Sequence, residues 1–83
     1  MATYEEVREV LVEHLGLKSE MIKLDSKLSE DLGADSVDAL EIAASLEEKF
    51  GTKLSDDEIA QLKHVSDIVT IVNQKLNANQ GKI

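Results

Sequence analysis

The sequence predicts an all-α protein, a small four-helix bundle with three longer helices, one short helix and a long loop between the first two. Three observations favour this fold class. Apolar residues recur at helical spacing in three separate segments. Helix-capping residues stand before these segments, and neither strand alternation nor an internal repeat is visible. With 83 residues the chain has room for one small domain.

The first helix is predicted to begin at Thr3. Thr3 and Glu6 have the spacing of a capping box, in which each residue satisfies a backbone N–H of the other. An apolar stripe at helical period follows, made of Val7, Val10, Leu11 and Leu15. Gly16 stands where a left-handed cap would end the helix.

Residues 17–34 have no regular period and predict a long loop. A short turn is expected near Ser19–Ile22. Loops of this length are uncommon in compact domains and are often functional. Apolar residues are expected to hold the loop against the core: Ile22, Leu24, Leu28 and Leu32.

The second helix is predicted from about Ser36 to Phe50, with Asp35 as its N-cap and Gly51 at its end. Asp38 lies near the positive end of this helix. One face forms a core stripe of Ala39, Ile42, Ala43, Leu46 and Phe50. A second stripe mixes apolar and acidic residues, namely Val37, Leu40, Glu41, Ala44 and Glu48.

Two further helices complete the predicted bundle. Ser55 and Glu58 make another capping box, which starts a short helix through about Leu62. The last helix starts near Ser66 and carries Ile68, Val69, Val72 and Leu76 on one face. We therefore expect a domain over residues 1–76 and a flexible polar tail over residues 77–83.

The net charge of −8 is concentrated in one part of the chain. Residues 30–58 hold ten acidic and two basic residues, and the remaining acids and bases cancel. Such a field repels nucleic acid and attracts basic protein surfaces. The alternative reading of the same charge is a solvated face that keeps the protein soluble.

Composition excludes several classes of protein. The absence of Cys excludes disulfides and thiolate metal sites. No apolar run approaches the roughly 18 residues that span a bilayer, and the N-terminus lacks the pattern of a signal peptide. We expect a cytoplasmic protein that neither inserts into membranes nor binds nucleic acid.

The most informative stretch is Asp31-Leu-Gly-Ala-Asp-Ser-Val-Asp-Ala-Leu-Glu41. It places Ser36 first in a helix, where free N–H groups and the helix dipole would favour a phosphate ester on the hydroxyl. An ordinary first-turn serine is the simpler alternative. A catalytic nucleophile needs a base, but the only histidines, His14 and His64, lie outside the motif. We therefore do not expect an enzyme.

This motif resembles the modification site of bacterial type II fatty-acid-synthase acyl carrier proteins. The resemblance extends to Leu46-Glu-Glu-Lys-Phe-Gly and covers roughly Thr3 to Leu76. It implies that Ser36 accepts 4′-phosphopantetheine from coenzyme A and that Asp35 contacts the transferase and its magnesium ion. The added arm would supply the thiol that the chain lacks, and acyl groups would be carried on it as thioesters.

The same resemblance implies partners and a surface for them. The partners are a phosphopantetheinyl transferase and enzymes of fatty acid synthesis with basic docking patches. Val37 and Ala44 stand where the family usually has Leu and Met, and Leu54-Ser55 replaces the common Ile-Pro. The implied docking residues are Val37, Asp38, Leu40, Glu41, Ala44, Glu47 and Glu48.

Several alternatives stay open from the sequence. The chain could carry another cargo (polyketide, aminoacyl or D-alanyl), or it could be an acidic adaptor that is never modified. We expect a monomer. The carboxylates lack EF-hand spacing, so strong calcium binding is not expected. Weak divalent binding is expected at Glu30, Asp31, Asp35 and Asp38.

Overall fold

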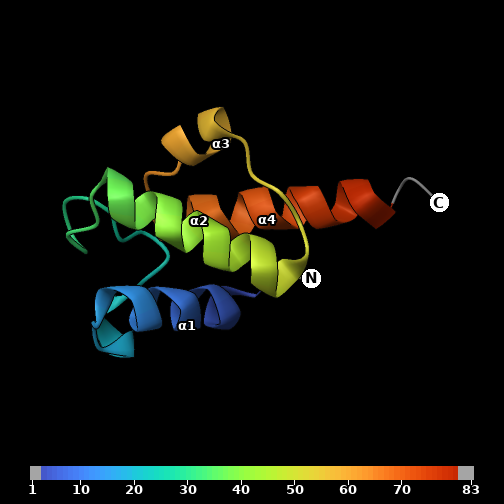
Figure 1. Cartoon of the computed structure of the whole chain (residues 1–83). Helices are drawn as coiled ribbons and strands as arrows, with labels where there is room; N and C mark the ends of the chain where they lie inside the picture. The colour runs from blue at the N-terminus through green and yellow to red at the C-terminus, as the bar shows by residue number, and fades with distance from the viewer. Residues whose placement is uncertain (1–2, 81–83) are drawn as a thin grey trace.

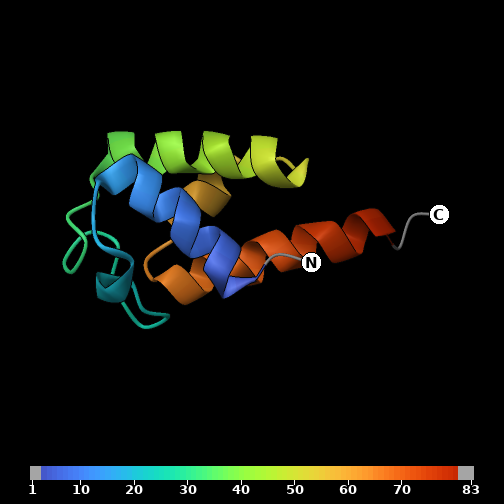
Figure 2. The same ribbon diagram turned by 90° about the horizontal axis from the view of Figure 1, so that it is seen from below.

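The computed structural model describes residues 3–80, with side chains described through residue 77. Its helices are α1 (Tyr4–Leu15), α2 (Ser36–Phe50), α3 (Asp56–Ala60) and α4 (Val65–Gln80), and a 3₁₀ turn covers Ser19–Met21. Figure 1 shows α2 between α1 and the short α3, with α4 running behind α2. Seen from below, the three long helices remain distinct, and α4 extends past the ends of the other two (Figure 2). The predicted all-α bundle and the turn in its long loop are confirmed.

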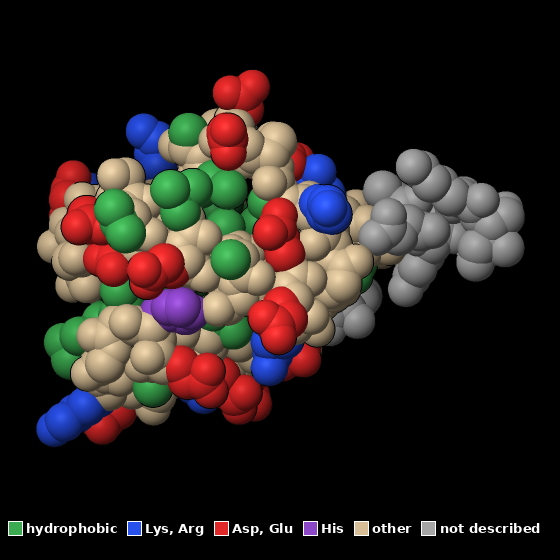
Figure 3. All heavy atoms as spheres, in the orientation of Figure 1, with side chains coloured by type: hydrophobic (Ala, Val, Ile, Leu, Met, Phe, Trp, Pro, Cys, Tyr) green, Lys and Arg blue, Asp and Glu red, His purple; other side chains and the backbone are tan. Residues whose placement is uncertain are grey.

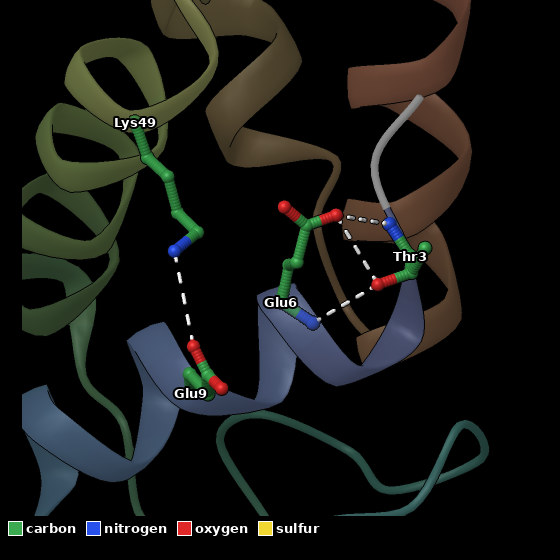
Figure 4. A network of polar contacts seen from close by, with 4 residues as sticks. All are labelled: Thr3, Glu6, Glu9 and Lys49. Atoms are coloured by element: carbon green, nitrogen blue, oxygen red, sulfur yellow. Dashed lines mark hydrogen bonds and ion pairs between the residues drawn. The ribbon is translucent and has the colours of Figure 1, made fainter.

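Local signals start α1, α2 and α3 and end α1 and α2 as predicted. Thr3 caps α1 and Ser55 caps α3, each in a complete capping box. Gly16 and Gly51 end α1 and α2 in the left-handed conformation, each with φ of 66°. Figure 4 shows the Thr3–Glu6 box beside an ion pair that joins α1 to α2. In that pair the Lys49 Nζ lies 3.8 Å from a carboxylate oxygen of Glu9.

The core combines the predicted faces of α1, α2 and α4 with part of the long loop. Ile22, Leu28 and Leu32 hold the loop in the core as predicted, but Leu24 is 48% exposed, so its predicted burial is wrong. Leu24 lies in a tight turn closed by the Ser26 N–H, which donates to the Lys23 carbonyl at 3.0 Å. This turn directs Leu24 away from the core. Buried residues of the helices are Val7, Val10, Leu11, Ile42, Ala43, Leu46, Val65, Ile68 and Val72.

Backbone bonds also tie the loop to the segment before α4. The Leu28 N–H donates to the Lys63 carbonyl at 2.9 Å, and the Val65 N–H donates to the Ser26 carbonyl at 3.0 Å. Between them Lys27 and His64 form an isolated antiparallel bridge. The loop is therefore fixed at its middle, next to the residues that lead into α2.

The ends of the last two helices differ from the prediction. α3 ends at Ala60, and α4 begins at Val65 and continues to Gln80. Residues 77–80, which belong to the tail predicted to be flexible, are therefore helical. No Gly or Pro interrupts the backbone ladder before Gly81, so nothing local stops the helix earlier. Residues 81–83 of the predicted tail lie outside the described residues.

Candidate functional site

Ser36 is the first residue of α2 and is exposed. The residues before it alternate between the core and the surface. Leu32 and Ala34 are each 7% exposed, whereas Gly33 between them has φ of 71°. The Ala34 N–H donates to the Leu28 carbonyl at 2.8 Å. Because the chain is anchored at Ala34, Asp35 and Ser36 emerge at the surface immediately after it.

A capping box fixes the helix start around Ser36. The Asp38 N–H donates to Asp35 Oδ1 at 2.9 Å, and the Asp35 N–H donates to Asp38 Oδ2 at 3.1 Å. The sequence predicted Asp35 as the N-cap, and the return bond from Asp38 was missed although the spacing of the two acids is visible. The Ser36 and Val37 N–H groups lie at the unbonded start of the helix.

These surroundings fit a phosphate ester on the Ser36 hydroxyl. Free N–H groups and the helix dipole attract an anion at this position. The carboxylates of Asp35 and Asp38 oppose it, but both accept hydrogen bonds from the helix backbone. An ester on the exposed hydroxyl would extend into solvent, where the two carboxylates are screened.

An apolar groove opens beside Ser36, with a cavity volume of about 840 Å³. Ala39, Leu40 and Ile42 of α2 form one wall, and Ile59 of α3 lies in the opposite one. Ile68 of α4 also lines the groove and is itself fully buried. Figure 3 shows the hydrophobic side chains that gather between α2 and α3 on this face. A groove of this kind suits an apolar chain attached near Ser36.

Most of the predicted docking residues share one exposed surface on α2. Val37 and Leu40 are 59% and 53% exposed, a large exposure for apolar side chains. Glu41, Ala44 and Glu48 are also exposed, and Asp38 is half-buried. Glu47 differs from them, because its Oε2 accepts a hydrogen bond from the Leu54 N–H at 2.8 Å.

The four carboxylates predicted to bind a divalent cation have different partners: two contact Lys27, and the other two form the capping box of α2. Glu30 pairs with the Lys27 Nζ at 3.3 Å, and Asp31 accepts from the Lys27 N–H at 2.8 Å. Asp35 and Asp38 bond to each other's backbone. Among residues 3–80 no group of three His, Cys, Asp or Glu residues is placed to hold a metal ion. Weak divalent binding stays a prediction that rests on charge relief.

The two histidines have other partners. His14 Nε2 and Ser45 Oγ lie 2.5 Å apart and join α1 to α2. His64 lines the groove, and its Nδ1 lies 3.4 Å from an Asp67 oxygen. Within the described part of the chain, neither histidine hydrogen bonds to Ser36. Ser36 is therefore an exposed serine that no histidine of residues 3–80 pairs with as a base would in a nucleophilic triad.

Fold and site together define a class of protein: a small helical bundle that presents an exposed serine, first in its helix, beside an apolar groove. Residues 5–72 match a family model described as a phosphopantetheine attachment site. The chain belongs to the acyl carrier protein family. Membership confirms the predicted family and its phosphopantetheine prosthetic group, on which members carry acyl groups.

Individual relatives agree with this assignment. The chain is 46% identical over 80 residues to an acyl carrier protein of Campylobacter hominis, covering 96% of this chain and 100% of that one. An acyl carrier protein of Campylobacter concisus is 43% identical, covering 89% and 96%.

Two solved structures share the fold. A crystal structure of an acyl carrier protein from Thermotoga maritima gives a TM-score of 0.78 at 28% identity, covering 89% of this chain and 86% of that one. A solution structure of hexanoyl acyl carrier protein from the actinorhodin polyketide synthase of Streptomyces coelicolor gives 0.81 at 28% identity, covering 94% of each. No helix within residues 3–80 is long and apolar enough to cross a membrane.

Proposed function

We propose that Ser36 is the residue that carries 4′-phosphopantetheine and that this chain carries acyl intermediates of fatty acid biosynthesis. The observation that supports this most directly is the exposed Ser36 at the start of α2, on the edge of an apolar groove. An apolar chain tethered at that position can fold back into the groove and leave water. No other exposed serine of the chain follows a motif of this kind.

The protein's own residues supply attachment, orientation and shelter. The bound group supplies a thiol, which a chain without Cys cannot supply itself. Asp35 and Asp38 hold the first turn of α2, so the hydroxyl stays exposed to a transferase. Ile42, Ile59 and Ile68 offer apolar surface to the acyl chain. In this proposal the chain is a carrier and not an enzyme.

The proposed partners dock on α2. A phosphopantetheinyl transferase contacts Asp35 together with its magnesium ion. Malonyl transacylase, ketoacyl synthases, reductases, dehydratase and acyltransferases bring basic patches to the exposed acidic and apolar surface of α2. The proposed docking residues are Val37, Asp38, Leu40, Glu41, Ala44, Glu47 and Glu48. We further propose that the protein works as a monomer in the cytoplasm.

The test is an intact-mass measurement. The chain is incubated with coenzyme A, magnesium and a broad-specificity phosphopantetheinyl transferase, and Ser36→Ala is treated in parallel. We expect a gain of one phosphopantetheine in the parent chain and none in the variant. A folded parent chain that never gains this mass would contradict the proposal and favour an unmodified acidic adaptor.

The cargo is tested by the loading enzyme. Loading of the modified chain by a malonyl transacylase supports fatty acid synthesis. Loading only by an adenylating ligase would instead indicate an aminoacyl or D-alanyl carrier. Loading by a polyketide acyltransferase, with no transfer by the malonyl transacylase of fatty acid synthesis, would indicate a polyketide carrier.

A further inference from the structure

We infer that Glu47 is a positioning residue that holds the α3 wall of the groove through the loop before it. The expected effect of Glu47 on an acyl chain in the groove rests on the proposed function. The hydrogen bond between Glu47 and the loop does not depend on that function. Glu47 lies on α2, and its Oε2 accepts the Leu54 N–H at 2.8 Å, seven residues further along the chain.

The loop that Glu47 holds is anchored in the core. Thr52 and Leu54 are only 6% and 8% exposed, although Lys53 between them is exposed. A backbone N–H next to such a buried side chain needs an acceptor, because leaving it unpaired costs free energy. Glu47 supplies that acceptor from the adjacent helix. Its carboxylate is therefore directed toward the loop, unlike that of the exposed Glu48.

α3 is held mainly through the segments at its two ends, of which the one after it is tied to the long loop by the bond from the Leu28 N–H to the Lys63 carbonyl. It contains five residues, none of which is buried. A helix this short is unstable alone, so its position depends on contacts with the rest of the fold. Ile59 is half-buried against the core. On the other side two carboxylates add polar contacts: Glu47 bonds to the loop before α3, and Glu58 of α3 pairs with the Lys75 Nζ of α4 at 2.8 Å.

The position of α3 decides the shape of the groove. Asp56, Ile59 and Ala60 come from α3 and line the groove opposite α2. The Leu54 N–H lies two residues before Asp56. If the bond from Glu47 is lost, α3 gains freedom to move away from α2. An apolar chain in the groove would then be less protected from water.

Two substitutions separate the geometry of Glu47 from its charge. Glu47→Asp keeps the charge, but its side chain is one methylene shorter and no longer reaches the Leu54 N–H. Glu47→Gln removes the charge and keeps an acceptor oxygen at the same reach. Glu48→Gln removes the same charge from the exposed neighbouring position and serves as the matched control.

The first measurement is amide hydrogen exchange at Leu54, made by NMR on the unmodified full chain. We expect exchange to become about five-fold faster in Glu47→Asp, because loss of an ordinary intramolecular hydrogen bond corresponds to about that factor. Glu47→Gln and Glu48→Gln should stay close to the parent chain. Exchange unchanged in Glu47→Asp, or as fast in Glu47→Gln as in Glu47→Asp, would overturn the inference.

The second measurement is cleavage of an acyl thioester by hydroxylamine on the modified chain. With an octanoyl group, Glu47→Asp should be cleaved about two- to ten-fold faster than Glu47→Gln. With an acetyl group, too short to enter the groove, the two variants should be equal. Equal rates with octanoyl, or the same acceleration with acetyl, would overturn the role in the groove. If Ser36 never accepts the arm, the proposed function fails. The exchange rate of the Leu54 amide still tests whether Glu47 accepts its hydrogen bond.

Discussion

The Glu58 carboxylate of α3 meets the Lys75 ammonium group of α4 at 2.8 Å. The same carboxylate oxygen accepts the Ser55 N–H at 2.8 Å, so one side chain both caps α3 and joins it to α4. The hydrogen bond with Lys75, followed by that with Ser55, lowers the pKa of Glu58 below its ordinary value of 4.5. The ionised form of Glu58 therefore favours the folded state.

The first prediction concerns pH. Because the pKa of Glu58 is lowered by folding, its contribution to stability is complete above about pH 4.5 and is lost as the pH falls through the lower folded-state value. Lys75→Gln should lower the melting temperature at pH 6, and the difference from the parent chain should shrink below pH 4.5. Circular dichroism melts from pH 3 to 6 measure this, and a difference independent of pH would contradict it.

The second prediction concerns Gly33, two residues before the capping residue of α2. Its φ of 71° is unfavourable for a residue with a Cβ, although an added Cβ would contact nothing within 4 Å. Gly33→Ala should therefore lower the free energy of unfolding by about 1 kcal/mol through backbone strain alone. Urea denaturation measures the loss. Gly33→Asn should lose less, because Asn tolerates this conformation better, and equal losses would argue against a conformational cause.

The third prediction separates the two roles assigned to Asp35. Asp35→Asn keeps an oxygen that can accept from the Asp38 N–H, so the free energy of unfolding should change by less than about 0.5 kcal/mol. Asp35→Ala removes the cap and should cost about 1 kcal/mol. Both variants should be modified more slowly by the transferase, as judged by intact mass over time. If Asp35→Asn is modified at the rate of the parent chain, the proposal that the Asp35 carboxylate contacts the transferase is wrong.

The fourth prediction concerns the exposed surface of α2. Glu41→Lys reverses one exposed charge and should change the free energy of unfolding by no more than about 0.5 kcal/mol. It should raise the apparent KM of the transferase for the chain, with a smaller effect at high salt, because the steering field weakens. A steady-state titration at two ionic strengths tests this. Lys18→Glu, an exposed charge reversal outside α2, should leave the KM nearer to that of the parent chain.

The fifth prediction concerns divalent cations. Millimolar magnesium should raise the melting temperature more than sodium chloride at equal ionic strength, because a cation held by the folded state stabilises it by mass action. The ten acids of residues 30–58 supply the charge that is relieved. The double variant Glu30→Gln, Asp31→Asn should show a smaller rise. An equal rise in melting temperature with both salts would mean that general charge screening, and not cation binding, causes the stabilisation.

The starts of the helices and the ends of α1 and α2 could be predicted from sequence alone because their determinants are local. A capping box such as Thr3 with Glu6 bonds across three residues, and Gly16 takes up a left-handed conformation that other residues resist. The same holds for Ser36, since an N-cap followed by an apolar stripe places it at the start of a helix.

Tertiary structure decided the features that depend on residues distant in the chain. The outward turn at Leu24 and the use of Glu47 as a backbone acceptor each depend on how loops pack on the bundle. The groove beside Ser36 exists because the short α3 lies next to α2, so that residues of both helices line it. Residue spacing reports which face of a helix is apolar, but it does not report which other segment that face meets. The local sequence therefore determines that Ser36 begins a helix, whereas the packing of the helices determines that an apolar groove lies beside it.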